Sequence, residues 1–339
     1  MRYKPFGDTG LRASVVGFGA IPIQRISIEE STKILRKAYE AGVNLFDTAR
    51  GYTDSEEKIG IALGDVRKNI ILATKTHAGT GDELRADLDT SLRNLKTDYI
   101  DLYQLHNPDF MPRPGDSNGL YDAAVEAKKA GKIRHICISY HKLNLANEAV
   151  DSGLYDSLQF PLSCISSEED YALEKKCRDA GMGFLAMKAM AGGLITNSKA
   201  AFAALYHKTE AIPIWGIQHE WELDEFIGYE KNPPPLDAAL LADIEKTKAE
   251  LAGSFCRGCG YCLPCPADIP IPMAARLSYM LGRSRIERYL SDDWARQMER
   301  INECVECGHC LAHCPYELNV PEVLKAQYKS FLDFKKANA

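Results

Sequence analysis

Four polar side chains with complementary proton chemistry follow three apolar runs in the first third of the chain. The stretch NLFDTARGY (44–52) begins with strand composition and ends in a polar loop that holds Asp47 and Tyr52. Lys75 directly follows the run NIILAT, and His106 follows YIDLYQL. Parallel α/β folds place their chemistry at the carboxyl ends of strands. The pattern therefore predicts that these four side chains form a proton-transfer cluster.

Eight of the eleven cysteines fall in two tight runs after residue 255. The first run is Cys256, Cys259, Cys262 and Cys265, and the second is Cys304, Cys307, Cys310 and Cys314. A proline follows the last cysteine of each run. The second run has the spacing of bacterial iron–sulfur ligation, and the first is one residue shorter before its last cysteine. Two-residue gaps curl the backbone so that three thiolates converge on one cluster, while the fourth reaches a neighbouring cluster.

A pair of structural zinc sites is the alternative interpretation of these runs. Zinc usually takes two paired knuckles separated by a longer loop, rather than three thiols within seven residues and a following Cys-Pro. A secreted disulfide scaffold would suit eleven cysteines only in a much shorter chain. The spacing favours iron–sulfur clusters.

The composition is that of a globular protein without a polyanionic or lipid partner. Of the 339 residues, 45% are hydrophobic and 26% are charged, which allows a sizeable core. The net charge of −6 gives no electrostatic footprint for nucleic acid. The N-terminal MRYKPFGDTG lacks the apolar stretch of a signal peptide, and no apolar run approaches the length of a membrane span. We expect a cytoplasmic protein.

Strand and helix patterns alternate through most of the chain, which argues for a parallel sheet. The expected strands are 13–18, 43–46, 69–74, 99–105, 133–138, 155–160, 183–187 and 211–215. Eight such units are the number that closes a (β/α)8 TIM barrel, here behind an N-terminal β-hairpin. A doubly wound open sheet is the alternative, but GFGAIP lacks the third glycine of a dinucleotide-binding turn.

The predicted organisation has three parts. They are the barrel (1–235), a linker helix (236–252) and a small, mostly α-helical iron–sulfur domain (253–339). Helices are expected within this last domain at about 271–281, 286–300 and 321–335.

DTARGY, with the lysine and histidine that follow it, resembles the aldo-keto reductases over essentially residues 1–230. The resemblance implies reduction of a small-molecule carbonyl compound or an activated alkene, with Tyr52 as general acid/base. Lys75 and Asp47 would tune Tyr52, because a nearby ammonium stabilises a phenolate and lowers its pKa. His106 would position the substrate. Each residue alone has a structural explanation, but all four in order favour the catalytic one.

The resemblance also implies a nicotinamide nucleotide, held by Ser139, Gln159, Met187, Lys188, Gly216 and Gln218. The pocket departs from the family in three places: Tyr140 replaces an asparagine, Met187 replaces an aromatic residue, and basic residues are lacking after the eighth strand. Trp215 is expected in its apolar wall. The stretch WGIQHEWELDEF carries Glu220 and Glu222 without Lys or Arg, and a carboxylate there favours a free ribose hydroxyl over a phosphate. NADH and NADPH both remain open.

The cysteine runs resemble those of two-cluster bacterial ferredoxins. That resemblance implies two 4Fe–4S clusters with crossed ligand sets. One cluster would be held by Cys256, Cys259, Cys262 and Cys314, and the other by Cys304, Cys307, Cys310 and Cys265. An external ferredoxin-type carrier would then be a candidate partner.

Three functions fit these features. The leading one is an oxidoreductase whose barrel exchanges electrons with the two clusters. The second is an electron-transfer or redox-sensing protein whose barrel binds nucleotide with little catalysis. In the third, the clusters only brace the fold, as other metal sites do. The complete set of four polar residues favours the enzyme.

Overall fold

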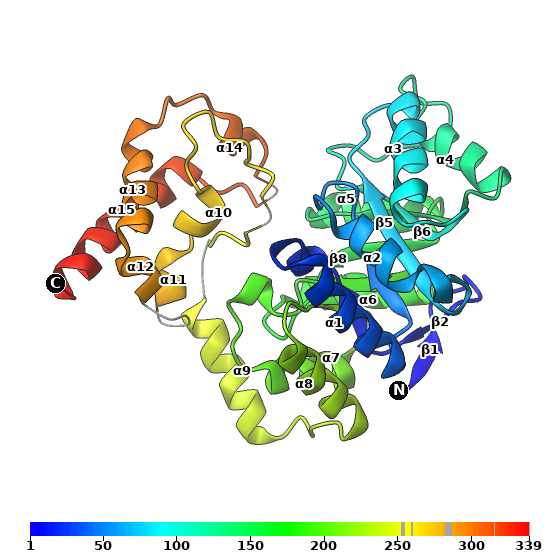
Figure 1. The fold of residues 1–339 in the computed structure, drawn as a ribbon, viewed down its shortest axis with the longest axis horizontal. Coiled ribbons are helices and arrows are strands. Elements are labelled where there is room, and N and C mark those ends of the chain that lie inside the picture. The colour runs from blue at the N-terminus through cyan, green and yellow to red at the C-terminus, as the bar shows by residue number, and fades with distance from the viewer. Residues whose placement is uncertain (252–254, 259, 282–286, 315, 339) are drawn as a thin grey trace. The chain divides into compact units, whose positions relative to one another are not determined.

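The computed structural model describes residues 1–251, 255–258, 260–281, 287–314 and 316–338 (Figure 1). The chain divides into two compact units. The barrel unit comprises Met1–Ala189 and Ser198–Ile244, and the C-terminal unit comprises Met190–Asn197 and Glu245–Ala339. The short segment between Met190 and Asn197 thus belongs with residues that come much later in the chain.

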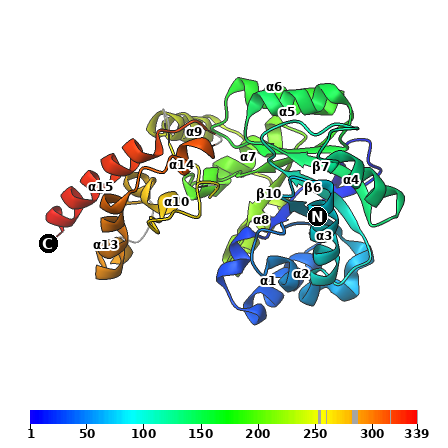
Figure 2. The same ribbon diagram turned by 90° about the horizontal axis from the view of Figure 1, so that it is seen from above.

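Eight parallel strands close into a barrel in the order β10-β3-β4-β5-β6-β7-β8-β9, which confirms the predicted TIM barrel. The strands are β3 Gly17–Gly19, β4 Leu45–Asp47, β5 Ile71–Thr76, β6 Ile100–His106, β7 Ile133–Ser139, β8 Ser157–Pro161, β9 Gly183–Met187 and β10 Ile212–Gly216. The helices between and after them are α1 Ile28–Glu40, α2 Ser55–Leu63, α3 Gly81–Asn94, α4 Leu120–Lys129, α5 Leu143–Ser152, α6 Glu168–Asp179, α7 Ser198–Lys208 and α8 Glu220–Lys231. Figure 2 shows α5 and α6 on one side of the strands and α1, α2 and α3 on the other.

The expected strand 13–18 is wrong as a single element. It divides into β2 Arg12–Ser14, which pairs antiparallel with β1 Tyr3–Pro5, and the first barrel strand β3. The side chain of Asn44 fixes this break, since its Oδ1 accepts from the Ser14 backbone N–H at 2.7 Å. The hairpin that results carries Phe6 into the apolar interior of the barrel.

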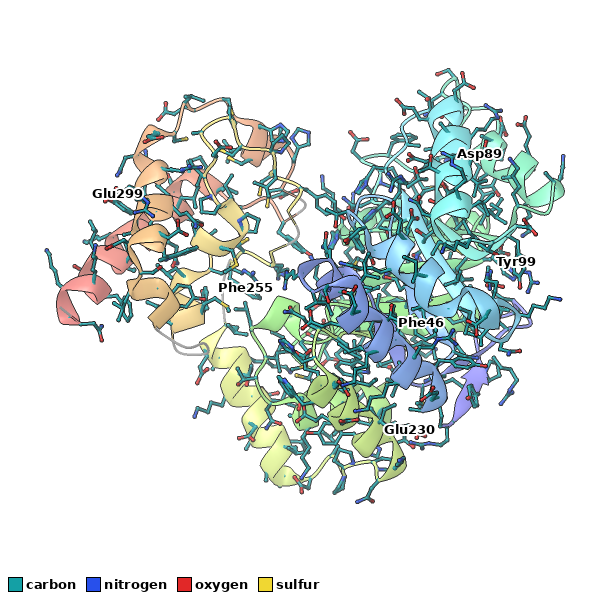
Figure 3. All side chains as sticks on the ribbon, in the orientation of Figure 1. Phe46, Asp89, Tyr99, Glu230, Phe255 and Glu299 are labelled. Carbon is teal, nitrogen blue, oxygen red and sulfur yellow. The ribbon has the colours of Figure 1, made fainter. Side chains whose placement is uncertain are left out.

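The N-terminal residues are fastened to the barrel by a buried carboxylate. Glu230 of α8, labelled in Figure 3, accepts from the backbone N–H of Arg2 at 2.8 Å and from its guanidinium at 3.0 Å. On α1, Ser27 and Glu30 form a reciprocal capping box that satisfies the first free N–H groups of the helix. These contacts hold the hairpin and first helix in place around the strands.

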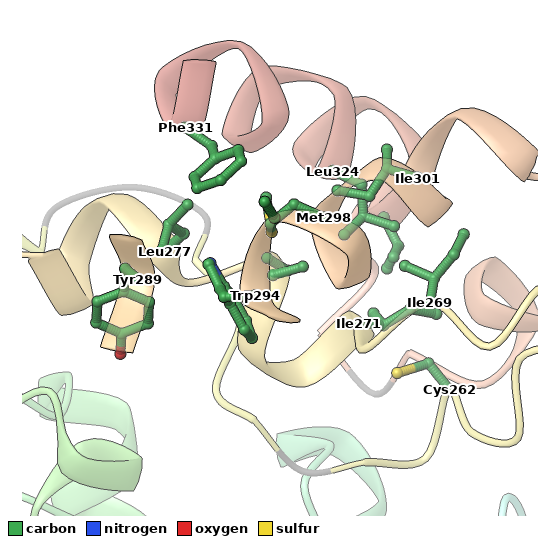
Figure 4. Close-up of a cluster of buried hydrophobic side chains, with 14 of the residues drawn as sticks. Cys262, Ile269, Ile271, Leu277, Tyr289, Trp294, Met298, Ile301, Leu324 and Phe331 are labelled. Carbon is green, nitrogen blue, oxygen red and sulfur yellow. The ribbon is translucent and has the colours of Figure 1, made fainter. Parts of the chain in front are cut away.

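The described part of the C-terminal unit is helical. Its helices are α10 Ile271–Ala274, α11 Leu277–Leu281, α12 Glu287–Leu290, α13 Asp292–Glu299, α14 His309–Ala312 and α15 Val320–Ala337, after α9 Ala238–Glu250. Short 3-10 turns occur at Ala191–Gly193 and Arg300–Glu303 in this unit, and at Ile21–Arg25 and Gly64–Asn69 in the barrel unit. Trp294 and Met298 from α13 converge with Leu324 and Phe331 from α15 in one apolar core (Figure 4).

Two helices expected as continuous in this unit are interrupted. The span 271–281 is divided between α10 and α11. Within 286–300, α12 ends at Leu290 and Ser291 begins α13, because its side chain accepts from the Trp294 backbone N–H at 3.2 Å. A serine that satisfies a free N–H group favours a helix start over a helix interior.

Candidate functional site

A layer of polar side chains lies above the apolar interior of the barrel. Alternate residues of a strand point to the same face, so each inward apolar residue predicts the next inward position two residues on. The pairs in chain order are Leu45–Asp47, Ala73–Lys75, Leu102–Gln104, Cys137–Ser139, Leu185–Met187 and Ile214–Gly216. The strands are parallel, so these positions gather at the carboxyl ends, where TIM barrels place their sites.

Asp47 and Lys75 form a buried ion pair at the centre of this layer. Lys75 Nζ donates to Asp47 Oδ1 at 2.7 Å and to the Thr48 carbonyl at 2.6 Å. The two side chains belong to residues that are only 3% and 1% exposed. Burial raises the pKa of Asp47 above its ordinary value, and the Lys75 charge is the strongest influence against that rise. An ammonium and a carboxylate buried together depend on each other for their charge.

Gln104 is a member of this layer that the sequence reasoning missed. Its Nε2 donates to Asp47 Oδ2 at 3.1 Å, while Gln159 Nε2 reaches Asp47 Oδ1 at 3.3 Å. Both amides oppose the rise in the pKa of Asp47. The inward period of two along IDLYQLH, applied back from His106, would have found Gln104.

Tyr52 lies in the loop between β4 and α2, next to the ion pair. Lys75 Nζ is 5.1 Å from the centre of the Tyr52 ring. Burial raises the pKa of Tyr52, the Lys75 charge opposes the rise, and Asp47 adds to it. The sequence-based expectation of a lowered pKa is thus corrected: Lys75 acts in that direction, but burial outweighs it.

His106 completes the group at the end of β6. Its ring lies edge-on to the Tyr52 ring at a centroid distance of 6.0 Å, with an interplanar angle of 82°. The ring of His77 stacks on its other side at 3.9 Å. Burial, followed by the charges of nearby basic groups, lowers the pKa of His106 well below its ordinary value. The structure therefore brings Asp47, Tyr52, Lys75 and His106 together, with His106 as a neutral imidazole at neutral pH.

Ser139 and Gln159 lie on adjacent strands beside this group, in register with each other. Ser139 Oγ accepts from the Asn107 backbone N–H at 3.2 Å. Gln159 is buried, and its Oε1 has no hydrogen-bond partner among the described residues. An unpaired buried acceptor beside the Tyr52 group matches the amide N–H₂ of a nicotinamide, so these residues fit that cofactor.

The other residues expected around the nucleotide lie at or just after the ends of the paired strands β9 and β10. Met187 packs against the apolar interior at the end of β9, and Lys188 follows it with a left-handed φ of 56°. Gly216 ends β10 opposite Gly19. Trp215 does not line the barrel: its ring stacks between Phe202 of α7 and Phe226 of α8, at 6.0 and 4.2 Å. It occupies an outward position of β10, so the expectation that it walls the pocket is wrong.

The loop after β10 leads into Glu220 and Glu222, the carboxylates expected to favour a free ribose hydroxyl. Glu222 caps α8 by accepting from the backbone N–H groups of Gln218 and His219 at 2.7 and 2.8 Å. Glu220 accepts ion pairs from Lys33 and Lys37 of α1, at 2.7 and 3.3 Å. Both carboxylates therefore already have hydrogen-bond or ion-pair partners, and the two lysines beside Glu220 come from a distant part of the sequence.

In the C-terminal unit, five cysteines line one cavity of about 320 Å³. The cysteines that line it are Cys262, Cys265, Cys304, Cys307 and Cys310. Burial raises the pKa of Cys310, and the neighbouring thiols of Cys304, Cys307 and Cys265 add to the rise. Four thiolates are the donor set of a 4Fe–4S cluster, so these residues fit that group. Two cysteines of the first run, Cys262 and Cys265, thus line the same cavity as three cysteines of the second run.

The remaining cysteines of the runs are less fully described. The Gly258 N–H donates to Cys256 Sγ at 3.4 Å, and Cys314 packs against the apolar core of the unit. Cys259 lies outside the described residues. Within the described ranges, no three His, Cys, Asp or Glu side chains are arranged to hold a single metal ion.

The guanidinium of Arg276 joins the first cysteine run to the segment Met190–Asn197. Its Nη1 donates to the Gly192 carbonyl at 2.7 Å, and its Nε donates to the Pro272 carbonyl at 2.8 Å. Gly192 and Gly258 both have positive φ, and a Cβ on Gly258 would lie 2.7 Å from the Arg276 Cζ. The two glycines therefore leave the space that the guanidinium fills.

A closed parallel barrel with its polar residues at the carboxyl ends of the strands defines the TIM-barrel class. The family profile described as the aldo/keto reductase family matches residues 15–241. A second profile, described as a 4Fe-4S dicluster domain, matches residues 255–319. The chain belongs to the aldo/keto reductase family and carries a C-terminal 4Fe–4S dicluster domain, as the two resemblances implied.

Individual relatives agree with this assignment. The aldo-keto reductase YhdN of Bacillus subtilis is 31% identical over 217 residues, which cover 58% of this chain and 64% of that protein. L-galactose dehydrogenase of Arabidopsis thaliana is 28% identical over 57% of this chain and 67% of its own length. The structure of an aldo-keto reductase from Bacillus halodurans superposes with a TM-score of 0.61 at 23% identity, covering 73% of this chain and 96% of that one. This last likeness is one of fold. No helix in the described ranges is long and apolar enough to cross a membrane.

Proposed function

We propose that the barrel reduces a small-molecule carbonyl compound or an activated alkene, with Tyr52 as the proton donor. A bound nicotinamide nucleotide, as aldo-keto reductases use, would supply the hydride. The observation that supports this most strongly is the buried Asp47–Lys75 pair beside Tyr52. A solvated lysine at a strand end would need neither the buried carboxylate nor the two amides that surround it.

Each side chain has a role that follows from its environment. The raised pKa keeps the Tyr52 phenol protonated at neutral pH, so a proton is available as negative charge develops on the substrate oxygen. The Lys75 ammonium stabilises the phenolate that remains after proton transfer. Asp47 keeps that ammonium charged and in place. Neutral His106 can hydrogen-bond the carbonyl oxygen and orient it.

The cofactor side of the proposal depends on Ser139 and Gln159. Gln159 Oε1 would accept from the carboxamide N–H₂ of the nicotinamide, and Ser139 would flank it. Met187, Lys188, Gly216 and Gln218 are proposed to surround the rest of the nucleotide. Since Glu220 and Glu222 are engaged elsewhere, they give no preference for NADH over NADPH.

For the C-terminal unit we propose two 4Fe–4S clusters with the crossed ligand sets. The cavity that Cys265 lines together with Cys304, Cys307 and Cys310 supports this set of four, and Cys262 of the other set lies at the same cavity. The other set is Cys256, Cys259, Cys262 and Cys314. Such clusters carry single electrons. We propose that they exchange electrons with the barrel reaction or with an external ferredoxin-type carrier, and that 1–235, 236–252 and 253–339 are the functional divisions of the chain.

Replacing Tyr52 with phenylalanine tests the reaction. Tyr52→Phe should lower kcat for NAD(P)H-dependent reduction of a panel of aldehydes and ketones by about 10²- to 10⁴-fold, because the positioned proton donor is lost. Nucleotide affinity, measured by calorimetry, should change little. The matched control is Tyr39→Phe, because the Tyr39 hydroxyl accepts from the side chain of Asn69 at the surface.

The same experiment separates the proposal from an electron-transfer or redox-sensing protein that binds nucleotide with little catalysis. That alternative predicts nucleotide binding by the unaltered chain without turnover of any carbonyl compound in the panel. Turnover that survives Tyr52→Phe would show that the proton comes from elsewhere.

A further inference from the structure

His77 is a histidine next to the proposed site to which no role has yet been assigned. The register of β5 with β6 places Thr76 opposite Leu105, so His77 follows on beside His106. Their rings stack with centroids 3.9 Å apart and an interplanar angle of 28°. His77 is nevertheless exposed to solvent, although one face of its ring stacks on His106.

The loop that carries Tyr52 holds the other edge of this ring. This loop continues the pairing of β4 with β5, since the Arg50 backbone N–H donates to the Lys75 carbonyl at 2.9 Å. The next residue, Gly51, therefore lies against His77. A Cβ at Gly51 would be 3.2 Å from His77 Cε1 and 3.3 Å from its Nδ1. The imidazole of His77 thus lies between Gly51, in the loop of Tyr52, and the ring of His106.

We propose that His77 is a positioning residue for His106, whose ring plane it fixes by stacking so that His106 presents one nitrogen to the substrate oxygen. This inference rests on the proposed function, because only the role of His106 at the carbonyl gives its orientation a consequence. His77 itself need not touch the substrate. Stacking is a suitable restraint here, because it limits rotation of the His106 ring about its side-chain bonds.

The charges around the pair give this arrangement a second consequence. The groups that face His106 are Tyr52, Lys75, His77, His141 and Lys188. Burial lowers the pKa of both His77 and His106, and lowers that of His106 further. The Asp87 carboxylate opposes the lowering of the pKa of His77, whereas no carboxylate is among the main influences on the pKa of His106. A proton therefore goes to His77 first, and its charge then opposes protonation of the stacked ring.

The test compares His77→Phe with His77→Leu in the full chain. Phenylalanine keeps a flat ring against His106 but carries no charge, and leucine loses both properties. Nuclear magnetic resonance of ¹⁵N-labelled histidines follows the titration of His106 without any turnover. In both variants the pKa of His106 should rise by roughly 0.5–1 unit, because a neighbouring positive charge has been removed.

Turnover then distinguishes stacking from charge. His77→Phe should retain kcat near neutral pH, and the acid limb of its pH profile should move upward with the pKa of His106. His77→Leu should lose about 10- to 100-fold in kcat with little change in the KM of the nucleotide, because His106 is no longer held in plane. His207→Gln on the exposed face of α7 is the control histidine substitution.

The outcomes separate this inference from the proposed function. If Tyr52→Phe abolishes turnover but both His77 variants keep the His106 titration and kcat of the unaltered chain, the inference is wrong and the function stands. If Tyr52→Phe leaves turnover intact, the function is wrong. The titration of His106 still decides whether His77 controls its charge.

Discussion

At the scale of residues, the proposed chemistry depends on one buried ion pair, Asp47–Lys75. Lys75 is bound by Asp47 and by the Thr48 carbonyl, and Asp47 also accepts from Gln104 and Gln159. This fixed lysine opposes the rise in the pKa of Tyr52 that burial causes. A phenol that is hard to ionise suits proton donation, and it needs a cation nearby to stabilise the product phenolate.

Replacing Lys75 tests this dependence. Lys75→Met should lower kcat by at least about 10²-fold, because the phenolate of Tyr52 loses its counter-charge. It should also lower the free energy of unfolding by about 3–5 kcal/mol, because Asp47 remains buried without its partner. The pKa of Tyr52 should rise further, so any alkaline limb of the residual activity should move to higher pH. Urea denaturation and pH profiles measure these effects.

Two further variants serve as controls. Lys132→Met breaks an exposed pair with Asp89 and should cost no more than about 1 kcal/mol. Lys75→Met combined with Asp47→Asn should regain stability without regaining activity, because the unpaired buried charge is gone. A double variant as unstable as Lys75→Met alone would contradict this account of the pair.

At the scale of elements, the sequence predicted what local patterns encode and failed where packing decides. Repeated strand–helix alternation predicted the barrel and its order. The contacts of Gln104 with Asp47 and of His77 with His106 join residues of different strands, so they needed the register between strands before they could be known. One strand was predicted over 13–18, but it is interrupted after Ser14, where the side chain of Asn44 binds the Ser14 backbone N–H. Trp215 was placed on the wrong face because an apolar strand end does not itself say which residues point inward.

Cys265 tests the crossed arrangement of the cysteine runs. Cys265→Ser should disturb the cluster held with Cys304, Cys307 and Cys310, because it lines the same cavity as these thiols. Iron should fall from about eight toward about four atoms per chain, with loss of one of two electron paramagnetic resonance signals after dithionite reduction. Cys164→Ser, at a buried cysteine outside both runs, is the control. An unchanged iron content in Cys265→Ser would exclude the crossed set.

At the scale of the whole molecule, the proposal is that hydride chemistry in the barrel and single-electron chemistry at the clusters communicate. An anaerobic titration of iron-replete protein with NADH, and separately with NADPH, should bleach the visible thiolate-to-iron absorption if they do. The effective nucleotide would also settle the preference that Glu220 and Glu222 leave undecided. Bleaching by dithionite but by neither nucleotide would show that the clusters are isolated from nicotinamide. An external ferredoxin-type donor or a bracing role would then be the remaining assignments.

The segment Met190–Asn197 has a consequence for biosynthesis. It is translated between β9 and β10, yet its Gly192 carbonyl is bound by Arg276, which follows 84 residues later. During translation, the last barrel strand and the helices after it therefore leave the ribosome before Arg276 is available to bind this segment. A chain truncated after residue 235 would keep all eight strands and still lack that partner, so an isolated barrel is not equivalent to the barrel within the full chain.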